Sequence, residues 1–232
     1  MSGIEHSRKA GEELVVYYRR RAAEYEAIYA KPERQADLAR LRADIPGLLQ
    51  GEDVLEVACG TGYWTAQIAP RARSVLATDV AGETLSVARS KFLPAGRVRL
   101  IEADAYRLDP SLGHFTAAFA GFWWSHIPRG RIAEFLHNLH ARLEPGARVV
   151  LLDNRYVEGS STPLAETDAD GNTYQQRRLA DGSVHRVLKN FPSPEQLRRD
   201  IGMAGLRIAE PPRVDELPHY WLCEYRLPAA RA

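Results

Sequence analysis

One short segment, residues 54–64, constrains the fold more than any other part of the chain. It reads Val-Leu-Glu-Val-Ala-Cys-Gly-Thr-Gly-Tyr-Trp, an apolar run followed by two glycines and the start of a helical pattern. Glycines allow a ligand to approach the backbone closely, and a helix N-terminus presents unpaired N–H groups. The segment therefore predicts a buried strand that leads into a nucleotide-binding turn.

The residues around the glycines narrow the choice of nucleotide. Dinucleotide-binding turns carry a third glycine three residues after the second, but Thr65 stands there. A phosphate-binding P-loop needs a lysine, and this turn contains none. The acidic Glu56 precedes the glycines at the strand end, which suits a positively charged ligand better than a phosphate. S-adenosylmethionine (SAM) is a ligand of that kind.

Apolar strand patterns and amphipathic helical patterns alternate through the middle of the chain. This alternation is typical of a mostly parallel sheet with helices on both faces. The predicted strands span residues 54–58, 74–78, 98–102, 115–120 and 148–153, and the predicted helices span 63–69, 83–92 and 129–143. The fold class is therefore α/β.

The N-terminal part and a later polar segment follow different patterns. Helical spacing predicts helices over residues 12–29 and 34–49, the second with a break near Pro46-Gly47. Strand-like runs at 172–179 and 183–190 flank Asp181-Gly182, which predicts a hairpin with a two-residue turn. This hairpin would be an insertion after the fifth strand.

The C-terminal part completes the expected domain. It predicts a helix from Pro194 to Ala204 with Ser193 as its N-cap, then strands at 206–209 and 220–227. We expect a single domain over residues 1–232, because no long Gly-, Ser- or Pro-rich linker divides the chain. Its expected parts are an N-terminal helical cap (1–50), a cofactor-binding core (51–153), the hairpin insertion (154–192) and a C-terminal helix with strands (193–232).

Composition limits the partners. The chain has 31 basic and 30 acidic side chains, so its formal net charge of +1 favours neither nucleic acid nor an anionic membrane. The N-terminus lacks the apolar core of a signal peptide, and the apolar runs are too short to span a bilayer. We therefore expect a soluble, cytoplasmic protein with a small-molecule partner. The sequence does not indicate its oligomeric state.

Cysteine and histidine spacing predicts no metal site. Cys59 and Cys223 are far apart and fall in different expected elements, which indicates two free thiols. His137 and His140 have helical spacing, but no Glu-x-x-His motif accompanies them. Both histidines are expected on an exposed helix face.

The segment at 54–64 resembles the cofactor loop of the class I, Rossmann-like SAM-dependent methyltransferases. The chain matches at Glu56, Gly60 and Gly62, and it has Ala58 where the family often has its first glycine. In that family an acidic residue and a Gly-rich loop cradle the amino-acid part of the cofactor. The resemblance covers about residues 50–155 and implies a seven-stranded sheet.

The ends of the second and third expected strands are similar to the family as well. Asp79, followed by Val80, stands where an acidic residue binds both ribose hydroxyls, and Asp104 and Ala105 stand where the adenine amine and a ring nitrogen are bound. A structural alternative is that the two aspartates only cap the turns after their strands. The resemblance implies SAM as cofactor and S-adenosylhomocysteine (SAH) as product.

The exit of the fourth strand bears on the methyl acceptor. Family members that methylate amide or adenine nitrogen carry an Asp/Asn-Pro-Pro-aromatic sequence there, but this chain has Gly121-Phe122-Trp123-Trp124. Gly121 is expected beside the cofactor, and Phe122 and Trp123 beside the substrate, whereas Trp124 is expected in the core. His126 is the candidate general base, needed only for a weakly acidic acceptor such as a hydroxyl.

Two further segments are expected to close the substrate site. The N-terminal helix carries Tyr18, Arg21 and Tyr25, which are able to contact a carboxylate and a ring. With a two-residue turn, strand alternation places Tyr174, Arg178 and His185 on one hairpin face, together with Gln176, Val187 and Lys189, and places Arg177 on the other. The alternative for both segments is that these polar side chains only form a solvent-exposed surface.

The sequence thus predicts a methyltransferase that moves a methyl group from SAM to oxygen or nitrogen of a small molecule by in-line displacement. Three alternatives stay open: methylation of a protein or RNA acceptor, a NAD-dependent oxidoreductase, and a SAM-binding protein without enzymatic activity.

Overall fold

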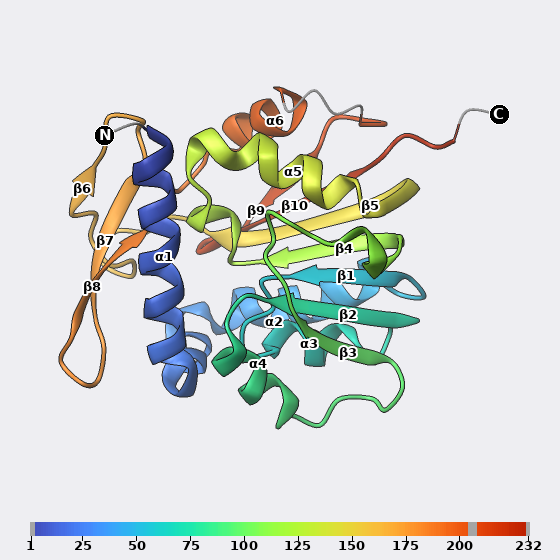
Figure 1. The fold of residues 1–232 in the computed structure, drawn as a ribbon, viewed down its shortest axis with the longest axis horizontal. Helices are drawn as coiled ribbons and strands as arrows, with labels where there is room; N and C mark the ends of the chain where they lie inside the picture. Colours follow the sequence, from blue (N-terminus) through green and yellow to red (C-terminus); the bar gives the residue numbers. More distant parts are fainter. Residues whose placement is uncertain (1–2, 204–207, 231–232) are drawn as a thin grey trace.

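The computed structural model describes residues 3–203 and 208–230, without the side chains of residues 3–10 and Ala23, and its centre is one seven-stranded sheet (Figure 1). The strand order is β3-β2-β1-β4-β5-β10-β9. The first five of these strands are parallel, and the last two run antiparallel to their neighbours. The strands are β1 (Asp53–Val57), β2 (Ser74–Asp79), β3 (Val98–Glu102), β4 (Phe115–Gly121), β5 (Leu143–Asn154), β9 (Arg213–Glu216) and β10 (Tyr220–Arg226). The α/β prediction is confirmed.

Helices cover both faces of this sheet, as its parallel strands require. The helices α5 (Ile132–His140) and α6 (Pro194–Met203) pack on one face in a cluster that includes Phe135 and Leu197. On the other face lie α2 (Gln35–Leu48) and α3 (Tyr63–Ile68), in a cluster with Leu38 and Ile68. The helix α4 (Gly82–Arg89) lies between β2 and β3 along the chain, and short 3₁₀ segments span Ala22–Ala30, Pro32–Arg34, Pro110–Leu112, Trp124–His126 and Arg129–Arg131.

A second layer stands across the carboxyl ends of the parallel strands. It consists of α1 (Gly3–Arg21) and a small antiparallel sheet of β6 (Glu166–Thr167), β7 (Thr173–Arg178) and β8 (Val184–Leu188) (Figure 1). Leu14 and Tyr17 of α1 pack against Val187 of β8. Arg19 contacts Glu83 of α4 at 3.4 Å, which ties α1 to the main sheet layer.

Several element bounds differ from those expected. The N-terminal helix begins at Gly3 and ends at Arg21, and the segment to Ala30 is 3₁₀ rather than α-helical. The predicted break near Pro46-Gly47 is wrong: α2 continues to Leu48 because Ile45 and Leu49, on either side of Pro46, are both fully buried in the core. The helix predicted to 143 ends at His140, and Leu143 already belongs to β5.

The C-terminal elements are partly as expected. Ser193 Oγ accepts a hydrogen bond from Gln196 N at 3.2 Å, which confirms the predicted N-cap of α6. Ala204, Leu206 and Arg207 lie outside the described residues. Residues 208–209 are not a strand, and the strand beside β10 is instead the polar β9. A polar sequence is tolerated there because β9 is an edge strand.

The predicted hairpin register is wrong by one residue. Residues 180–182 form a three-residue loop with Gly182 at φ +84°, so Leu179 N donates to Ser183 O and Arg177 faces His185. A one-residue slip moves side chains to the opposite face of a strand. Tyr174, Gln176 and Arg178 therefore do not share a face with His185, whereas Gln175 and Arg177 do.

Two further observations concern membranes and metals. Within residues 3–203 and 208–230, none of the helices combines the length and apolar composition that a membrane span needs. The same residues contain no cluster of three or more histidine, cysteine or acidic side chains arranged to hold a metal ion. His137 is exposed as expected, but His140 is buried and hydrogen-bonded through Nε2 to the Tyr225 hydroxyl at 2.7 Å.

Candidate active site

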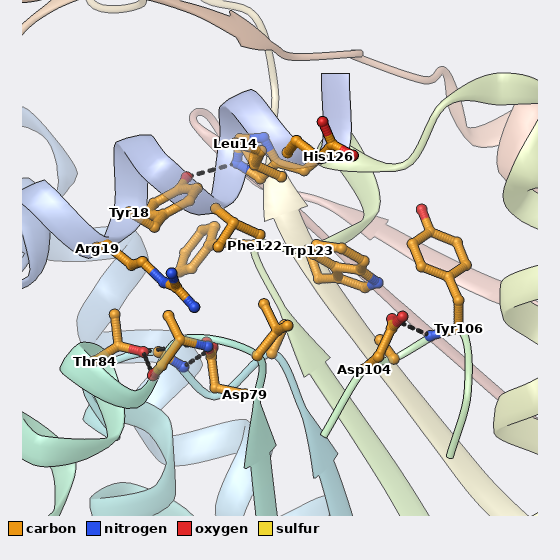
Figure 2. A pocket seen from close by; sticks show the side chains of 18 of the residues that line it. Leu14, Tyr18, Arg19, Asp79, Thr84, Asp104, Tyr106, Phe122, Trp123 and His126 are labelled. Atoms are coloured by element: carbon orange, nitrogen blue, oxygen red, sulfur yellow. Dashed lines mark hydrogen bonds between the residues drawn. The ribbon is translucent and has the colours of Figure 1, made fainter. Parts of the chain in front are cut away.

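A cavity of about 460 Å³ lies where the carboxyl ends of β1 to β4 meet α1. Figure 2 shows Leu14, Tyr18 and Arg19 of α1 on one side of it and Asp79 and Asp104 on the other. We call it the first cavity. Seven of the residues expected to bind the cofactor line it: Ala58, Gly60, Asp79, Val80, Asp104, Ala105 and Gly121.

The other two expected residues, Glu56 and Gly62, lie behind the wall of the first cavity. Glu56 is buried, and its Oε2 accepts a hydrogen bond from Thr65 Oγ1 at 2.7 Å. Gly62 adopts φ +73°, and a Cβ there would lie 2.9 Å from the Cβ of Ala88. Both residues therefore shape the turn from within: Glu56 anchors the start of α3, and Gly62 lets α4 pack closely against the turn.

Burial raises the pKa of Glu56 to about 8 from its ordinary 4.5. Between these two pH values Glu56 is therefore protonated in the folded protein and ionised in the unfolded chain. The free energy of unfolding is expected to fall as pH rises through this interval, by up to about 1.4 kcal/mol per pH unit. In Glu56→Gln, which has no such proton, this contribution to the slope is expected to vanish. Urea denaturation of both proteins between about pH 5 and pH 8 measures it. Identical slopes would show that Glu56 is ionised in the folded state.

Two non-glycine residues of the cavity wall have a left-handed backbone, Ala58 at φ +52° and Phe122 at φ +60°. This conformation costs an L-residue about 1–2 kcal/mol, and such strain collects at functional sites. Ala58 stands where loops that resemble this one often have glycine. It adopts the left-handed backbone that glycine adopts readily, so the turn is kept. Phe122 follows the last residue of β4 and lines the cavity.

Asp79 and Asp104 are each held by backbone groups and still face the first cavity. Asp79 Oδ2 accepts from Gly60 N at 2.8 Å, and its Oδ1 accepts from Ala81 N at 2.9 Å. Thr84 Oγ1 donates to the same Oδ1 at 3.1 Å. Asp104 Oδ1 accepts from Tyr106 N at 2.9 Å. The carboxylates therefore cap their turns and also line the cavity.

Sequence reasoning missed two residues of the first cavity, Tyr106 and Arg131. Tyr106 lines it, and the guanidinium of Arg131 lies 3.5 Å from the centre of the Tyr106 ring. Trp123 also lines it, in an edge contact with Tyr106, and its buried Nε1 has no hydrogen-bond partner among the described residues (Figure 2). Trp124 is buried in the core against Trp221, as expected.

A second cavity, of about 340 Å³, adjoins the first beneath the small sheet. Four residues line both cavities, Tyr18, Tyr25, Phe122 and His126, and we call them the seam. Of the other residues expected near a substrate, Arg21 and Arg178 line the second cavity and Trp123 lines the first. Tyr174 and His185 line neither: the Tyr174 hydroxyl donates to Asp168 at 2.9 Å, and His185 Nε2 is paired with Ser183 Oγ at 2.8 Å.

His126 and Tyr18 join the exit of β4 to α1 at the seam. His126 Nδ1 lies 2.7 Å from Leu188 O, which only accepts, so Nδ1 carries the proton. His126 Nε2 then accepts from the Tyr18 hydroxyl at 2.7 Å (Figure 2). Burial and the charges of Lys189 and Arg177 hold the pKa of His126 well below its usual range. The imidazole is therefore neutral, with Nε2 directed to the seam.

A buried ion pair underlies the second cavity. Lys189 Nζ lies 3.1 Å from Asp153 Oδ1 and donates to Ser125 Oγ at 2.5 Å. Ser125 N donates to Asp153 Oδ2 at 2.9 Å, so three segments meet at this group. Burial lowers the pKa of Lys189 to about 8. The pair ties β8 and β5 to the segment that carries His126.

Comparison with known proteins gives consistent results. Residues 54–146 match the family described as "Methyltransferase domain". The chain is 34% identical to an O-methyltransferase of Penicillium expansum over 61% of this chain and 57% of that protein. It is 31% identical to a ubiquinone/menaquinone biosynthesis C-methyltransferase of Azotobacter vinelandii over 49% of this chain and 47% of that protein. The chain thus spans about half the length of these curated relatives.

A solved structure decides the assignment. DhpI, determined in complex with SAH, is 31% identical to this chain, with a TM-score of 0.73 over 95% of this chain and 97% of DhpI. The chain belongs to the class I SAM-dependent methyltransferases. A second DhpI structure, a complex with SAM and HEP, is 29% identical, with a TM-score of 0.76. Membership of this family removes the NAD-dependent oxidoreductase alternative.

The first cavity of this methyltransferase has the donors and acceptors that SAM requires. Two carboxylates, Asp79 and Asp104, face the cavity and are able to accept hydrogen bonds from hydroxyl and amino groups. Gly60 brings the backbone close, and the Trp123 side chain forms an aromatic part of the wall. These residues fit the cofactor that the family uses.

Proposed function

We propose that this methyltransferase moves a methyl group from SAM in the first cavity to an oxygen or nitrogen of a small-molecule acceptor in the second. One observation carries the proposal: the two cavities share the seam of Tyr18, Tyr25, Phe122 and His126. An acceptor in the second cavity would therefore reach the first only between these four side chains. Residues of α1 and of the small sheet line the second cavity and limit its size, which supports a compact acceptor.

In this proposal the residues of the first cavity hold the cofactor by its polar groups. Asp79 binds the ribose hydroxyls, Asp104 the adenine amine and the Ala105 amide a ring nitrogen, while Gly60 and Gly121 leave room for the chain that carries the sulfur. When bound, SAM supplies a methyl carbon that an acceptor lone pair attacks as the carbon–sulfur bond breaks and the sulfur keeps the electron pair. Such a displacement depends mainly on positioning.

His126 is the proposed proton acceptor when the methylated atom is a hydroxyl oxygen. Its Nε2 carries the lone pair at the seam and is occupied by the Tyr18 hydroxyl. The acceptor hydroxyl would replace Tyr18 there, or pass its proton through the Tyr18 oxygen to Nε2. Burial raises the pKa of Tyr18 above its usual range, so this phenol stays protonated and able to donate.

The relatives support a small-molecule acceptor without naming it. Their names include an O-methyltransferase and a C-methyltransferase of quinone biosynthesis. One DhpI structure contains SAM together with HEP. These relatives thus differ in the acceptor atom that their names give, oxygen or carbon.

SAH release tests the proposal. The protein is incubated with SAM and, separately, with hydroxy and amino small molecules, total cell protein and total RNA, and SAH is quantified by mass spectrometry. We expect SAH above the SAM-only control with members of the small-molecule set. SAH formation with the protein or RNA fraction alone would overturn the small-molecule acceptor.

A further inference from the structure

Cations outnumber acids on the wall of the second cavity. Six cations line it, Arg21, Lys31, Arg34, Arg177, Arg178 and Lys189, whereas Glu24 is the one carboxylic acid among the described residues on its wall. The whole chain carries a formal net charge of only +1. The wall of this cavity therefore has an excess of positive charge that the chain as a whole does not have.

Among the residues that the structure describes, only one of these cations has a buried carboxylate partner. Lys189 pairs with Asp153. Arg177 instead donates through Nε and Nη2 to the amide oxygen Oε1 of Gln175, at 3.1 and 2.7 Å. No ion pair joins Arg177 or Arg21 to a carboxylate in the part of the chain that the structure describes.

Arg21 and Arg177 lie at the end of the cavity that meets the seam. The Arg21 guanidinium is 5.5 and 5.3 Å from the ring centres of Tyr17 and Tyr25. The charge of Arg177 also helps to lower the pKa of His126, as does that of Arg21, so both cations act on the seam. A third cation, Lys31, donates to Ser160 O at 2.9 Å on the same wall.

Uncompensated positive charge in a half-buried cavity is unfavourable. A guanidinium that loses water needs a counter-charge, and neighbouring cations repel one another. An anion in the cavity removes both costs, and a guanidinium fork matches the paired oxygens of a carboxylate or a phosphoryl group. The arrangement of charges is thus suited to a bound oxyanion.

We propose that the methyl acceptor carries an anionic group, a carboxylate or a phosphoryl oxyanion, which Arg177 and Arg21 bind beside the seam. The inference rests on the proposed function, because it places the acceptor in the second cavity. The anionic group positions the acceptor, and the aromatic rings of Tyr18, Tyr25 and Phe122 contact its remaining part.

Calorimetric titration of the SAH-loaded protein tests the proposal with three matched probes: benzoate, phenylphosphonate and benzyl alcohol. We expect at least one of the two anions to bind about tenfold or more tightly than the neutral alcohol, with an affinity that falls as salt is added. The preferred anion distinguishes a carboxylate acceptor from a phosphoryl one. Equal affinities for all three probes would overturn the proposal.

Variants locate the binding site. Arg177→Met and Arg21→Met are each expected to weaken binding of the preferred anion about tenfold or more while SAH affinity stays the same. Arg20→Met is the control, because Arg20 is an exposed neighbour on α1 with the same charge. Thermal melting confirms that each variant is folded. Unchanged anion binding in folded Arg177→Met and Arg21→Met would place the anion elsewhere and overturn the assignment.

The two proposals fail in different ways. Methyl transfer to neutral acceptors only, with no preference for anions, would contradict the anionic acceptor and leave the proposed methyl transfer intact. Tight binding of the anions without SAH formation from any small molecule would contradict the proposed function and leave an anion-binding cavity.

Discussion

Replacing Lys189 with methionine is expected to lower the free energy of unfolding by about 3–5 kcal/mol, because it leaves a buried carboxylate without its counter-charge. Asp153 is fully buried, and Lys189 Nζ is the cation beside it at 3.1 Å. Methionine preserves the length of the side chain but provides no charge and no donor for Ser125 Oγ. Urea denaturation of wild type and variant at neutral pH measures the loss.

Two companion variants separate charge from packing. Lys91→Met removes an ion pair with Glu26 that is partly exposed, and is expected to cost no more than about 1 kcal/mol. The double variant Lys189→Met/Asp153→Leu removes both charges and is expected to recover much of the stability lost in Lys189→Met. A loss below about 1 kcal/mol in Lys189→Met would contradict the view that this pair holds β8 to the His126 segment.

Replacing Asp79 with alanine is expected to weaken SAH binding about 10- to 100-fold, which corresponds to a loss of about 1.4–2.8 kcal/mol. The carboxylate is the proposed partner of the ribose hydroxyls and is held at the cavity wall by Gly60 N, Ala81 N and Thr84 Oγ1. Alanine removes the ribose contacts and frees these three donors. Isothermal titration calorimetry with SAH measures the affinity.

The matched control for Asp79 is Asp109→Ala. Asp109 Oδ1 accepts a hydrogen bond from Ser111 N at 2.8 Å, so it caps a turn in the same way, but it does not line the first cavity. Both variants lose a cap, and only Asp79→Ala is expected to lose SAH affinity. Equal SAH affinity in the folded Asp79→Ala variant and wild type would show that Asp79 only caps its turn.

The main sheet could be predicted from the sequence because its strands are buried on both faces. Such strands appear as continuous apolar runs, and the strand predicted at residues 74–78 is β2, in which residues 75–78 are all buried. The same runs placed Asp79, Asp104 and Gly121 at one edge of the sheet, since parallel strands end together. Seven of the nine expected cofactor residues consequently line the first cavity.

The small sheet was less predictable because its sequence allows two turn lengths. Asp181-Gly182 is compatible with a two-residue turn, but the structure uses a three-residue loop with Gly182 at φ +84°. With this register Arg177 faces His185 and Gln175 faces Val187, and Arg177 and Gln175 line the second cavity whereas Tyr174 does not. Turn residues alone do not fix the register of a polar hairpin, because few apolar side chains select one face.

The second cavity is assembled from segments that are distant in sequence. The Tyr18 hydroxyl meets His126 across 108 positions, and Lys31 reaches Ser160 across 129. Local sequence patterns do not predict such long-range contacts, since each segment alone is equally compatible with a solvent-exposed polar surface. The concentration of cations therefore became visible only in the folded chain.

A crystal structure of the protein with SAH tests the central claim most directly. The account predicts density in the first cavity, with the ribose at Asp79, the adenine at Asp104 and Ala105, and the sulfur facing the seam of Tyr18, Tyr25, Phe122 and His126. SAH bound with its sulfur directed away from the second cavity, or bound outside the first cavity, would contradict it.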